Sequence, residues 1–253
     1  MNKTNNIYLY NNTLINLLTL ITFLINKHII PSNIKSEEYQ PSLIDEIINL
    51  ELEDNTNIIR QIINKLGLNV FNIIYTIYLS NDENKELIIF FFILSSLKYQ
   101  KNVIYMHNLK YVNEALKIAH YVKRESHKMK GFIRFKELKN NILYAEFSPE
   151  NNVIFLIVNH FKQRLNNEYW IIKDIKRNII CIYDKKDINF FYDVDLNLNS
   201  LSSNEILIEE LWKNFYKTIG IKERKNSRCR MNFMPKKYWK YIIEMSDEIE
   251  TSC

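Results

Sequence analysis

The chain is poor in the residues on which several familiar protein classes depend. Its 253 residues include only three glycines, and none of them lies in a Gly-rich phosphate-binding loop. The three cysteines, Cys181, Cys229 and Cys253, are odd in number and scattered, so neither a disulfide framework nor a C-x-x-C metal pair is available. His-x-Glu, His-Glu-x-x-His and serine-elbow motifs are also absent. The sequence therefore predicts no metal site and no cofactor, argues against enzymes with a familiar motif, and indicates a cytoplasmic protein.

Two apolar runs raise the question of a membrane. The first, LINLLTLITFLI from Leu14, and the second, LIIFFFILSSL from Leu87, are both shorter than the roughly 20 apolar residues that a helix needs to cross a bilayer. Because Lys3 precedes the first run, that run could also be a signal-peptide core, but it lacks a small-residue cleavage pattern. We expect both runs to be buried helices.

Strand and helix patterns alternate along the first half of the chain. Residues 6–11, NIYLYN, predict a strand that leads into the first apolar run. In residues 47–53, IINLELE, apolar and polar side chains alternate, which predicts a second strand with one buried face. Helical patterning covers residues 56–97, and a further helix is expected from Val112 to Gly131, a favoured residue at a helix C-terminus.

Strands dominate the stretch that follows. GFIRFKEL and NILYAEF predict a hairpin, Pro149 is expected to open a helix, and YWIIKDI, NIICIYD and INFFYD predict further strands. The short links between strands favour an α+β fold with an antiparallel sheet over βαβ units. We expect a single domain, residues 1–253, that could divide into residues 1–110 and 111–253, with a helical C-terminus.

The positive charge is concentrated near the C-terminus. A capping-box spacing at Ser202 and Glu205 predicts a helix that Gly220 closes, and Pro235 is expected to open a final helix after a loop at residues 221–234. Between Lys213 and Lys240 there are ten Lys or Arg and a single acid, a net charge of +9, whereas the whole chain carries +5. The charge is thus a local property of this segment.

This basic segment has two interpretations. Its cations could neutralise several phosphates of a nucleic acid, while an exposed Tyr238 or Trp239 stacks on an unpaired base, a contact worth roughly 1 to 3 kcal/mol. Alternatively, both rings are core residues at helical spacing and the charges only solvate a surface loop. The loop cations are Lys222, Arg224, Lys225, Arg228 and Arg230.

Two histidines are candidates for acid–base chemistry. His127 and His160 each lie beside an arginine that could hold an anionic substrate, and Asp174 is a candidate orienting carboxylate. This interpretation requires the three side chains to converge. The alternative is that each histidine is a hydrogen-bonded structural residue. His120 and His127 are too far apart along one helix, at about 1.5 Å per residue, to share a metal easily.

Three segments resemble those of a known family. They are SHKMKGFIRFKEL, HFKQRLNNEYWIIKDIKR and LWKNFYKTIGIKERKNSRCRMNFMPKKYWK, and the last is the most specific. Over its full length the chain resembles a bacterial family of DNA-repair and DNA-metabolism proteins whose shared domain has no established function. The resemblance carries over to a set of polar and aromatic positions in this sequence. They are His127, Gly131, Arg134, His160, Arg164, Trp170, Asp174, Arg177, Trp212, Arg224, Asn226, Arg228, Pro235, Tyr238 and Trp239.

The resemblance implies DNA as the working substrate. Members of the family are often encoded beside a radical-SAM protein, and longer members are joined to a uracil-DNA-glycosylase-like domain, so it also implies such a partner. This chain departs from the family at YNNTLIN, where a Gly-containing turn is usual, and at Ser227, where we expect a proline that would stiffen the loop. Cys229 replaces an apolar residue, so we expect it to be packed and unreactive.

The sequence and the resemblance together predict a DNA-repair or DNA-processing protein that binds DNA through the basic loop. Lys236 and Lys237, together with Arg134, Arg164 and Arg177, are expected to extend the positive surface. Two alternatives stay open. One is a docking module whose basic, aromatic C-terminus binds the radical-SAM or glycosylase partner without touching DNA. The other is a glycosylase-like or nuclease-like enzyme that acts on a flipped base through His127 and His160.

Overall fold

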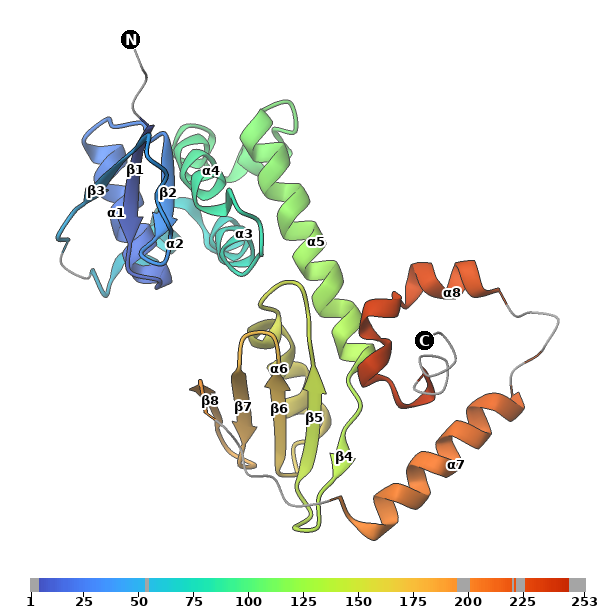
Figure 1. The fold of residues 1–253 in the computed structure, drawn as a ribbon. Helices are drawn as coiled ribbons and strands as arrows, with labels where there is room; N and C mark the ends of the chain where they lie inside the picture. Colours follow the sequence, from blue (N-terminus) through green and yellow to red (C-terminus); the bar gives the residue numbers. More distant parts are fainter. Residues whose placement is uncertain (1–4, 53–54, 195–200, 220, 222–225, 246–253) are drawn as a thin grey trace. The chain divides into compact units, whose positions relative to one another are not determined.

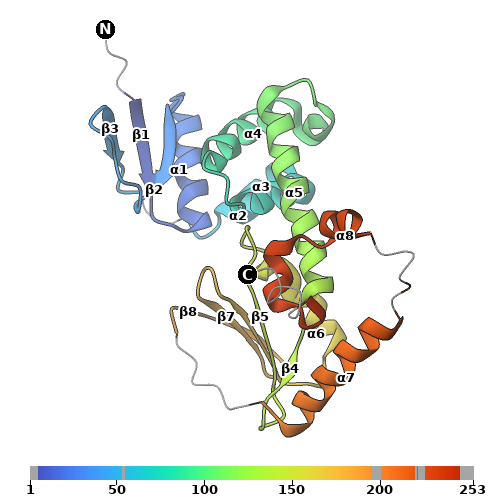
Figure 2. The ribbon, with the colours of Figure 1, turned by 45° about the vertical axis from the view of Figure 1, so that its right-hand side comes forward.

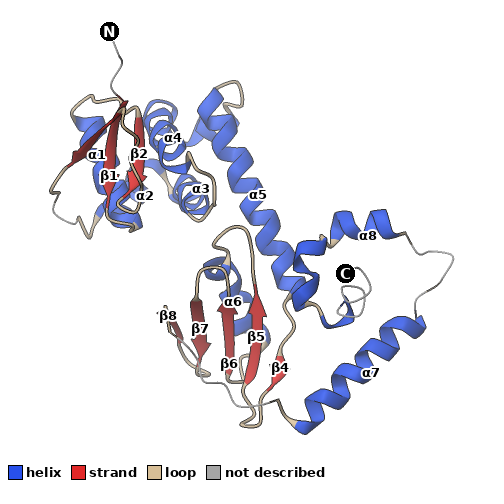
Figure 3. Ribbon diagram, in the orientation of Figure 1, coloured by secondary structure: helices blue, strands red, loops and turns tan. Residues whose placement is uncertain are grey.

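The chain forms two compact units in a computed structural model that describes residues 5–52, 55–194, 201–219, 221 and 226–245 (Figure 1). The first unit lies within residues 1–123 and the second within residues 124–253. The boundary between the two units falls inside helix α5 (Lys110–Phe132). Both units combine helices with a sheet (Figure 3), so the α+β class predicted from the sequence is confirmed.

The sheet of the first unit is parallel. Strand β1 (Asn5–Tyr10) lies between β2 (Asn33–Ser36) and β3 (Asp45–Asn49), and both neighbours run in its direction. Helix α1 (Leu14–Asn26) links β1 to β2, which makes a βαβ unit. The expectation that antiparallel pairing replaces βαβ units does not hold for this sheet, because α1 is long enough to carry the chain back across it.

Both apolar runs lie in the core of the first unit, as predicted. Leu17, Leu18 and Ile21 of α1 pack in one buried cluster with Ile89 and Phe90 of α4. Among the described residues, one helical stretch, Lys85–Tyr105, is long and apolar enough by composition to cross a membrane, and 39% of its apolar window is buried inside the protein. The remaining helical elements are α2 (Ile58–Leu66), α3 (Leu68–Tyr78), α4 (Lys85–Tyr99) and the 3-10 helix η1 (Gln100–Tyr105).

The second unit is built on a mixed five-stranded sheet in the order β4-β5-β6-β7-β8, with α6 on one side of it (Figure 2). The predicted hairpin is confirmed as the antiparallel pair β4 and β5, although β4 has only two residues. Strands β5 and β6 are parallel because α6 connects them, and α6 begins at Ile154 and not at Pro149. The bounds are β4 (Lys136–Glu137), β5 (Leu143–Phe147), α6 (Ile154–Arg164), β6 (Trp170–Asp174), β7 (Ile179–Tyr183) and β8 (Ile188–Tyr192).

The described residues of the C-terminal segment are mostly helical. The Ser202 hydroxyl accepts a hydrogen bond from the Glu205 backbone N–H at 3.1 Å, which confirms the predicted start of α7 (Ser203–Ile219). Part of the expected basic loop is instead helix α8 (Ser227–Phe233), which the Asn226 side chain caps. The final helix is a 3-10 helix, η3 (Lys236–Tyr241), followed by η4 (Ile243–Met245).

Candidate nucleic-acid interface

A buried carboxylate joins three segments of the second unit. Glu125 of α5 is 4% exposed, and its Oε1 accepts hydrogen bonds from the Glu150 backbone N–H at 2.8 Å and from the Tyr238 hydroxyl at 2.6 Å. Its Oε2 accepts a bond from the backbone N–H of Asn151 at 2.9 Å, and the Asn151 side-chain amide donates to the same oxygen. These charge-assisted bonds attach η3 and the loop before α6 to the end of α5.

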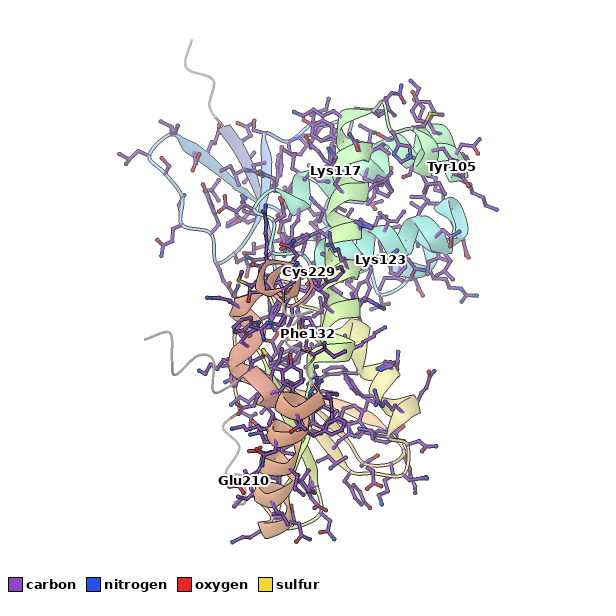
Figure 4. All side chains as sticks on the ribbon, turned by 90° about the vertical axis from the view of Figure 1, so that its right-hand side faces the viewer. Tyr105, Lys117, Lys123, Phe132, Glu210 and Cys229 are labelled. Carbon is purple, nitrogen blue, oxygen red and sulfur yellow. The ribbon has the colours of Figure 1, made fainter. Side chains whose placement is uncertain are left out.

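The two aromatic rings of the basic segment are buried. Tyr238 is 5% exposed and Trp239 is 4% exposed, and the ring of Tyr238 lies 5.8 Å from that of Phe132, which Figure 4 labels near the end of α5. The Trp239 indole N–H donates to the Met234 carbonyl at 2.9 Å. The expectation that an exposed Tyr238 or Trp239 stacks on an unpaired base is therefore wrong for this conformation, because neither ring offers a free face to a base.

The rings instead position cations. The guanidinium of Arg230 lies 5.0 Å from the Trp239 ring centre and the ammonium of Lys236 lies 5.7 Å from it, while the ammonium of Lys237 lies 5.0 Å from the Tyr238 ring centre. Cations at such distances are attracted to the ring faces. The buried rings of Tyr238 and Trp239 thus contact these positive groups from beneath and help to hold them at the surface.

Cations from α5 and η3 lie near one another, and we call Arg124, Lys128 and Lys237 the cation cluster. Burial, and then the nearby charges of Arg124 and Lys237, lower the pKa of Lys128, although Glu125 opposes the shift. Arg124 and Lys237 are exposed. Lys237 also forms an ion pair with Glu150, and the Lys128 ammonium donates to the Asn232 carbonyl at 3.4 Å. Like charges held this close repel one another, so the cluster favours a bound anion.

Three arginines were expected to extend the positive surface; two of them form ion pairs within the unit and one is exposed. Arg134 Nη2 lies 2.7 Å from Glu244 Oε1, and Arg177 Nη1 lies 3.1 Å from Asp174 Oδ2. Burial alone would raise the pKa of Glu244, but the bonds from Arg134 and Trp212 lower it. Both arginines therefore serve internal ion pairs, which corrects their expected role, whereas Arg164 on α6 is exposed.

The three residues proposed for catalysis do not form a base–carboxylate arrangement. Asp174 is buried at the end of β6, where its Oδ1 accepts from the backbone N–H groups of Lys176 and Arg177 and its Oδ2 pairs with Arg177. No hydrogen bond joins Asp174 to His127 or His160 within the described part of the chain. His127 is exposed on α5, and burial together with Lys130 and Arg164 lowers the pKa of His160.

The other predicted positions are placed as follows. Arg228 of α8 and Lys236 of η3 are exposed, whereas Lys222, Arg224 and Lys225 lie outside the described residues. Cys229 is exposed on α8 (Figure 4), so the expectation that it is packed is wrong. Cys181 is the buried cysteine, and burial raises the pKa of its thiol to about 12.

From the sequence, Arg124 was expected only as the arginine beside His127, and Lys128 was not among the expected binding residues. The signal was present, because these residues are four apart on one helix and so share a face. What the spacing could not show is that Lys237, more than a hundred residues later, lies beside that face. Among the described residues, no group of three or more His, Cys, Asp and Glu side chains is placed to hold a metal.

The first unit contains a pocket of a different character. It has a volume of about 480 Å³ and opens at the carboxyl ends of β1 and β3, where ligands bind in open parallel sheets. Its polar lining includes the carboxylates of Glu37 and Glu51 and the amides of Asn11, Asn16 and Asn49, and no Lys or Arg contributes. Such a lining does not suit a phosphate backbone, so the cation cluster is the better candidate for a nucleic-acid interface.

Comparison with known protein families and structures gives a family but no characterised relative. A family described as a domain of unknown function (DUF4130) matches residues 83–244, which is more than half of the chain. The match includes the cation cluster and all of the sheet of the second unit, and it leaves out the parallel sheet of the first. No curated protein and no solved structure matches.

Proposed function

The chain belongs to this family of unknown function, and we propose that it is a DNA-binding protein of DNA repair or DNA metabolism that holds the phosphate backbone at the cation cluster. The observation that carries the proposal is the arrangement of Arg124, Lys128 and Lys237, which come from two elements far apart in the sequence and lie close enough for the charges of Arg124 and Lys237 to act on Lys128. A phosphate bound there would relieve the repulsion among the three cations. Each neutralised phosphate also releases counterions, which adds to affinity.

Further cations lie on the elements that carry the cluster. Arg228 and Lys236 are exposed on α8 and η3, and the ring of Trp239 supports Lys236 from below. The Glu125 junction attaches η3 to α5, so the positive groups of both elements are presented as one surface. This arrangement suits contacts to phosphates, which position a nucleic acid without reading its sequence.

The test is a salt series with fluorescent duplex and single-stranded DNA. We expect binding that weakens steeply as salt rises, and the double variant Arg124→Gln/Lys128→Gln should bind less tightly at low salt. Its slope of log affinity against log salt should be shallower by about two, one for each lost phosphate contact.

A matched control is the double variant Lys139→Gln/Lys186→Gln, which removes the same charge from exposed turns of the sheet. It should keep the wild-type slope. Binding that is absent, that does not respond to salt, or that is lost equally in both double variants would overturn the proposal. The first two outcomes would favour the docking module that touches no DNA.

We also propose that the DNA-bound protein acts with a radical-SAM protein or a uracil-DNA-glycosylase-like protein. The support for this partner is the resemblance described above and not a feature of the described residues. Co-expression with the radical-SAM protein tests it, because a complex should survive copurification after nuclease treatment. A catalytic role is not part of the proposal, since His127, His160 and Asp174 are not joined in the structure.

A further inference from the structure

The pocket of the first unit lies at the point where the strand order of its parallel sheet reverses. The chain passes from β1 through α1 to β2 on one side of β1, and β3 then pairs with the other side (Figure 1). In open parallel sheets, ligands bind at such a point, outside the carboxyl ends of the strands. Residues at the ends of all three strands and on one side of α1 line the pocket. They are Leu9, Tyr10, Asn11, Asn16, Thr19, Leu20, Glu37, Asn49, Leu50, Glu51 and Leu52.

The formal charges on the wall of this pocket are all negative. Glu37 directly follows β2 and Glu51 lies two residues after β3, and no Lys or Arg lines the pocket. Neither carboxylate is in an ion pair with another described residue. The N-terminus of α1 lies at the same end of the sheet and favours an anion, but its dipole amounts to only about half a charge. The two carboxylates outweigh it, so the pocket attracts a cation.

Two oxygens of α1 beside this pocket lack a hydrogen-bond partner. Asn16 and Thr19 are three residues apart, so they share a face of α1, and both line the pocket. Asn16 Oδ1 and Thr19 Oγ1 are buried, and neither bonds to any described residue. Buried polar atoms in folded proteins nearly always have a partner. A small rotation of either side chain toward a donor held in the pocket would supply one, and ionised carboxylates also only accept. The lining therefore suits a ligand rich in N–H donors.

Apolar side chains complete the wall. Leu9, Leu20, Leu50 and Leu52 line the same pocket as the carboxylates, and Leu20 is buried. They offer contact to a hydrocarbon stem. A metal ion fits less well, because the described residues contain no group of three or more His, Cys, Asp and Glu placed to hold one. A volume of about 480 Å³ also has room for an organic molecule.

We propose that this pocket binds a small aliphatic amine that is positively charged at neutral pH. An ammonium group has three N–H donors and a full charge, so it matches both the carboxylates and the oxygens of α1. A diamine offers one ammonium to Glu37 and one to Glu51, while its methylene stem contacts the leucines. The site lies within residues 9–52, outside the residues that the family model matches.

The first test is calorimetric titration of 1,4-diaminobutane into the full chain at low salt. We expect saturable binding of one diamine per chain that weakens as salt rises, because the carboxylates are exposed. The matched ligand is 1,4-butanediol, which has the same length and no charge, and it should not bind. Inorganic phosphate is the probe of opposite charge and should not bind in this pocket either.

The double variant Glu37→Gln/Glu51→Gln locates the binding. It keeps the shape of the pocket and removes both charges, so the diamine should bind about tenfold more weakly. The control, Glu46→Gln/Glu83→Gln, removes the same charge from exposed residues of the same unit that do not line the pocket, and its affinity should equal that of the wild type. Urea unfolding should give the wild-type midpoint for both variants, which shows that any loss of binding is not a loss of fold.

Three outcomes would overturn the proposal. They are absence of diamine binding, binding of butanediol as tight as that of the diamine, and equal weakening in the two double variants. Binding of phosphate that Asn16→Asp abolishes would also overturn it, since the N-terminus of α1 would then be the feature that selects the ligand. None of these outcomes bears on the cation cluster, which lies in the second unit, so this proposal and the proposed function fail separately.

Discussion

The Tyr238 hydroxyl donates a hydrogen bond to the Glu125 carboxylate at 2.6 Å, across 113 residues of sequence. This bond connects the C-terminal 3-10 helix to α5, and both residues are buried. It explains why Tyr238 lies among so many basic residues. The tyrosine holds η3 in place from inside, and the cations of η3 then lie next to those of α5.

Tyr238→Phe should lower the free energy of unfolding of the second unit by about 1 to 3 kcal/mol. The substitution keeps the ring but leaves a buried carboxylate with one donor fewer. Urea unfolding measures the loss. Tyr241→Phe, three residues after Tyr238 on the same 3-10 helix, is the control and should change stability by less than about 0.5 kcal/mol. Equal losses of stability in the two variants would show that the hydrogen bond to Glu125 contributes no more to the free energy of unfolding than the Tyr241 hydroxyl does.

Arg177→Ala should destabilise the second unit by about 3 kcal/mol at neutral pH, because it leaves the Asp174 carboxylate buried without its ion-pair partner. Burial raises the pKa of Asp174 although Arg177 opposes the shift. A raised pKa means that the folded state holds the proton more tightly than the unfolded state.

The contribution of Asp174 to stability is therefore full below the unfolded pKa of about 3.9 and is lost as the pH rises through the folded pKa. Arg177→Ala should enlarge that loss, so its deficit should shrink as the solution is acidified. Urea unfolding at several pH values measures the effect, and Asp174→Asn should remove the pH-dependent part. A deficit in Arg177→Ala that does not vary with pH would refute this account.

DNA binding should be linked to the protonation of Lys128. The free protein has a lowered pKa at Lys128, and a bound phosphate should raise it again. Affinity should therefore fall as the pH rises through the lowered pKa toward the unperturbed value of about 10.4. Lys128→Gln should weaken this pH dependence and Lys139→Gln should not. NMR of the lysine side chains would measure the pKa directly, and a value unchanged by DNA would contradict phosphate binding at the cluster.

Gly67→Ala should destabilise the first unit by about 1 to 3 kcal/mol. Gly67 separates α2 from α3 with φ of +90°, a conformation that an L side chain adopts only with strain. The matched control is Gly131→Ala within α5, where a Cβ would meet nothing within 4 Å. Alanine is the better helix former there, so that variant should gain about 0.5 to 1 kcal/mol. Thermal unfolding measures the change in stability of each variant. If both variants gained stability or both lost it, the proposed difference between the two backbone positions would be wrong.

Much of the fold could be predicted because local patterns determine local structure. The apolar run from Leu14, the period of Val112 to Met129 and the capping spacing at Ser202 each predict a helix that is present. Strands β6, β7 and β8 likewise follow from short apolar stretches between turns. The predictions were wrong where the direction of strand pairing had to be known, as in the parallel sheet of the first unit. Strand direction depends on the path of the chain between strands and not on residue type.

The sequence by itself determined the elements, the α+β class and the concentration of positive charge near the C-terminus. Only the tertiary structure decided what each side chain does. Tyr238 and Trp239 were expected to stack on bases, but they are buried and contact cations instead. Arg134 and Arg177 were expected to face DNA, but they form ion pairs with Glu244 and Asp174. The reason is physical: exposure and charge pairing depend on residues that are far away in the chain, and spacing along the sequence carries no information about them.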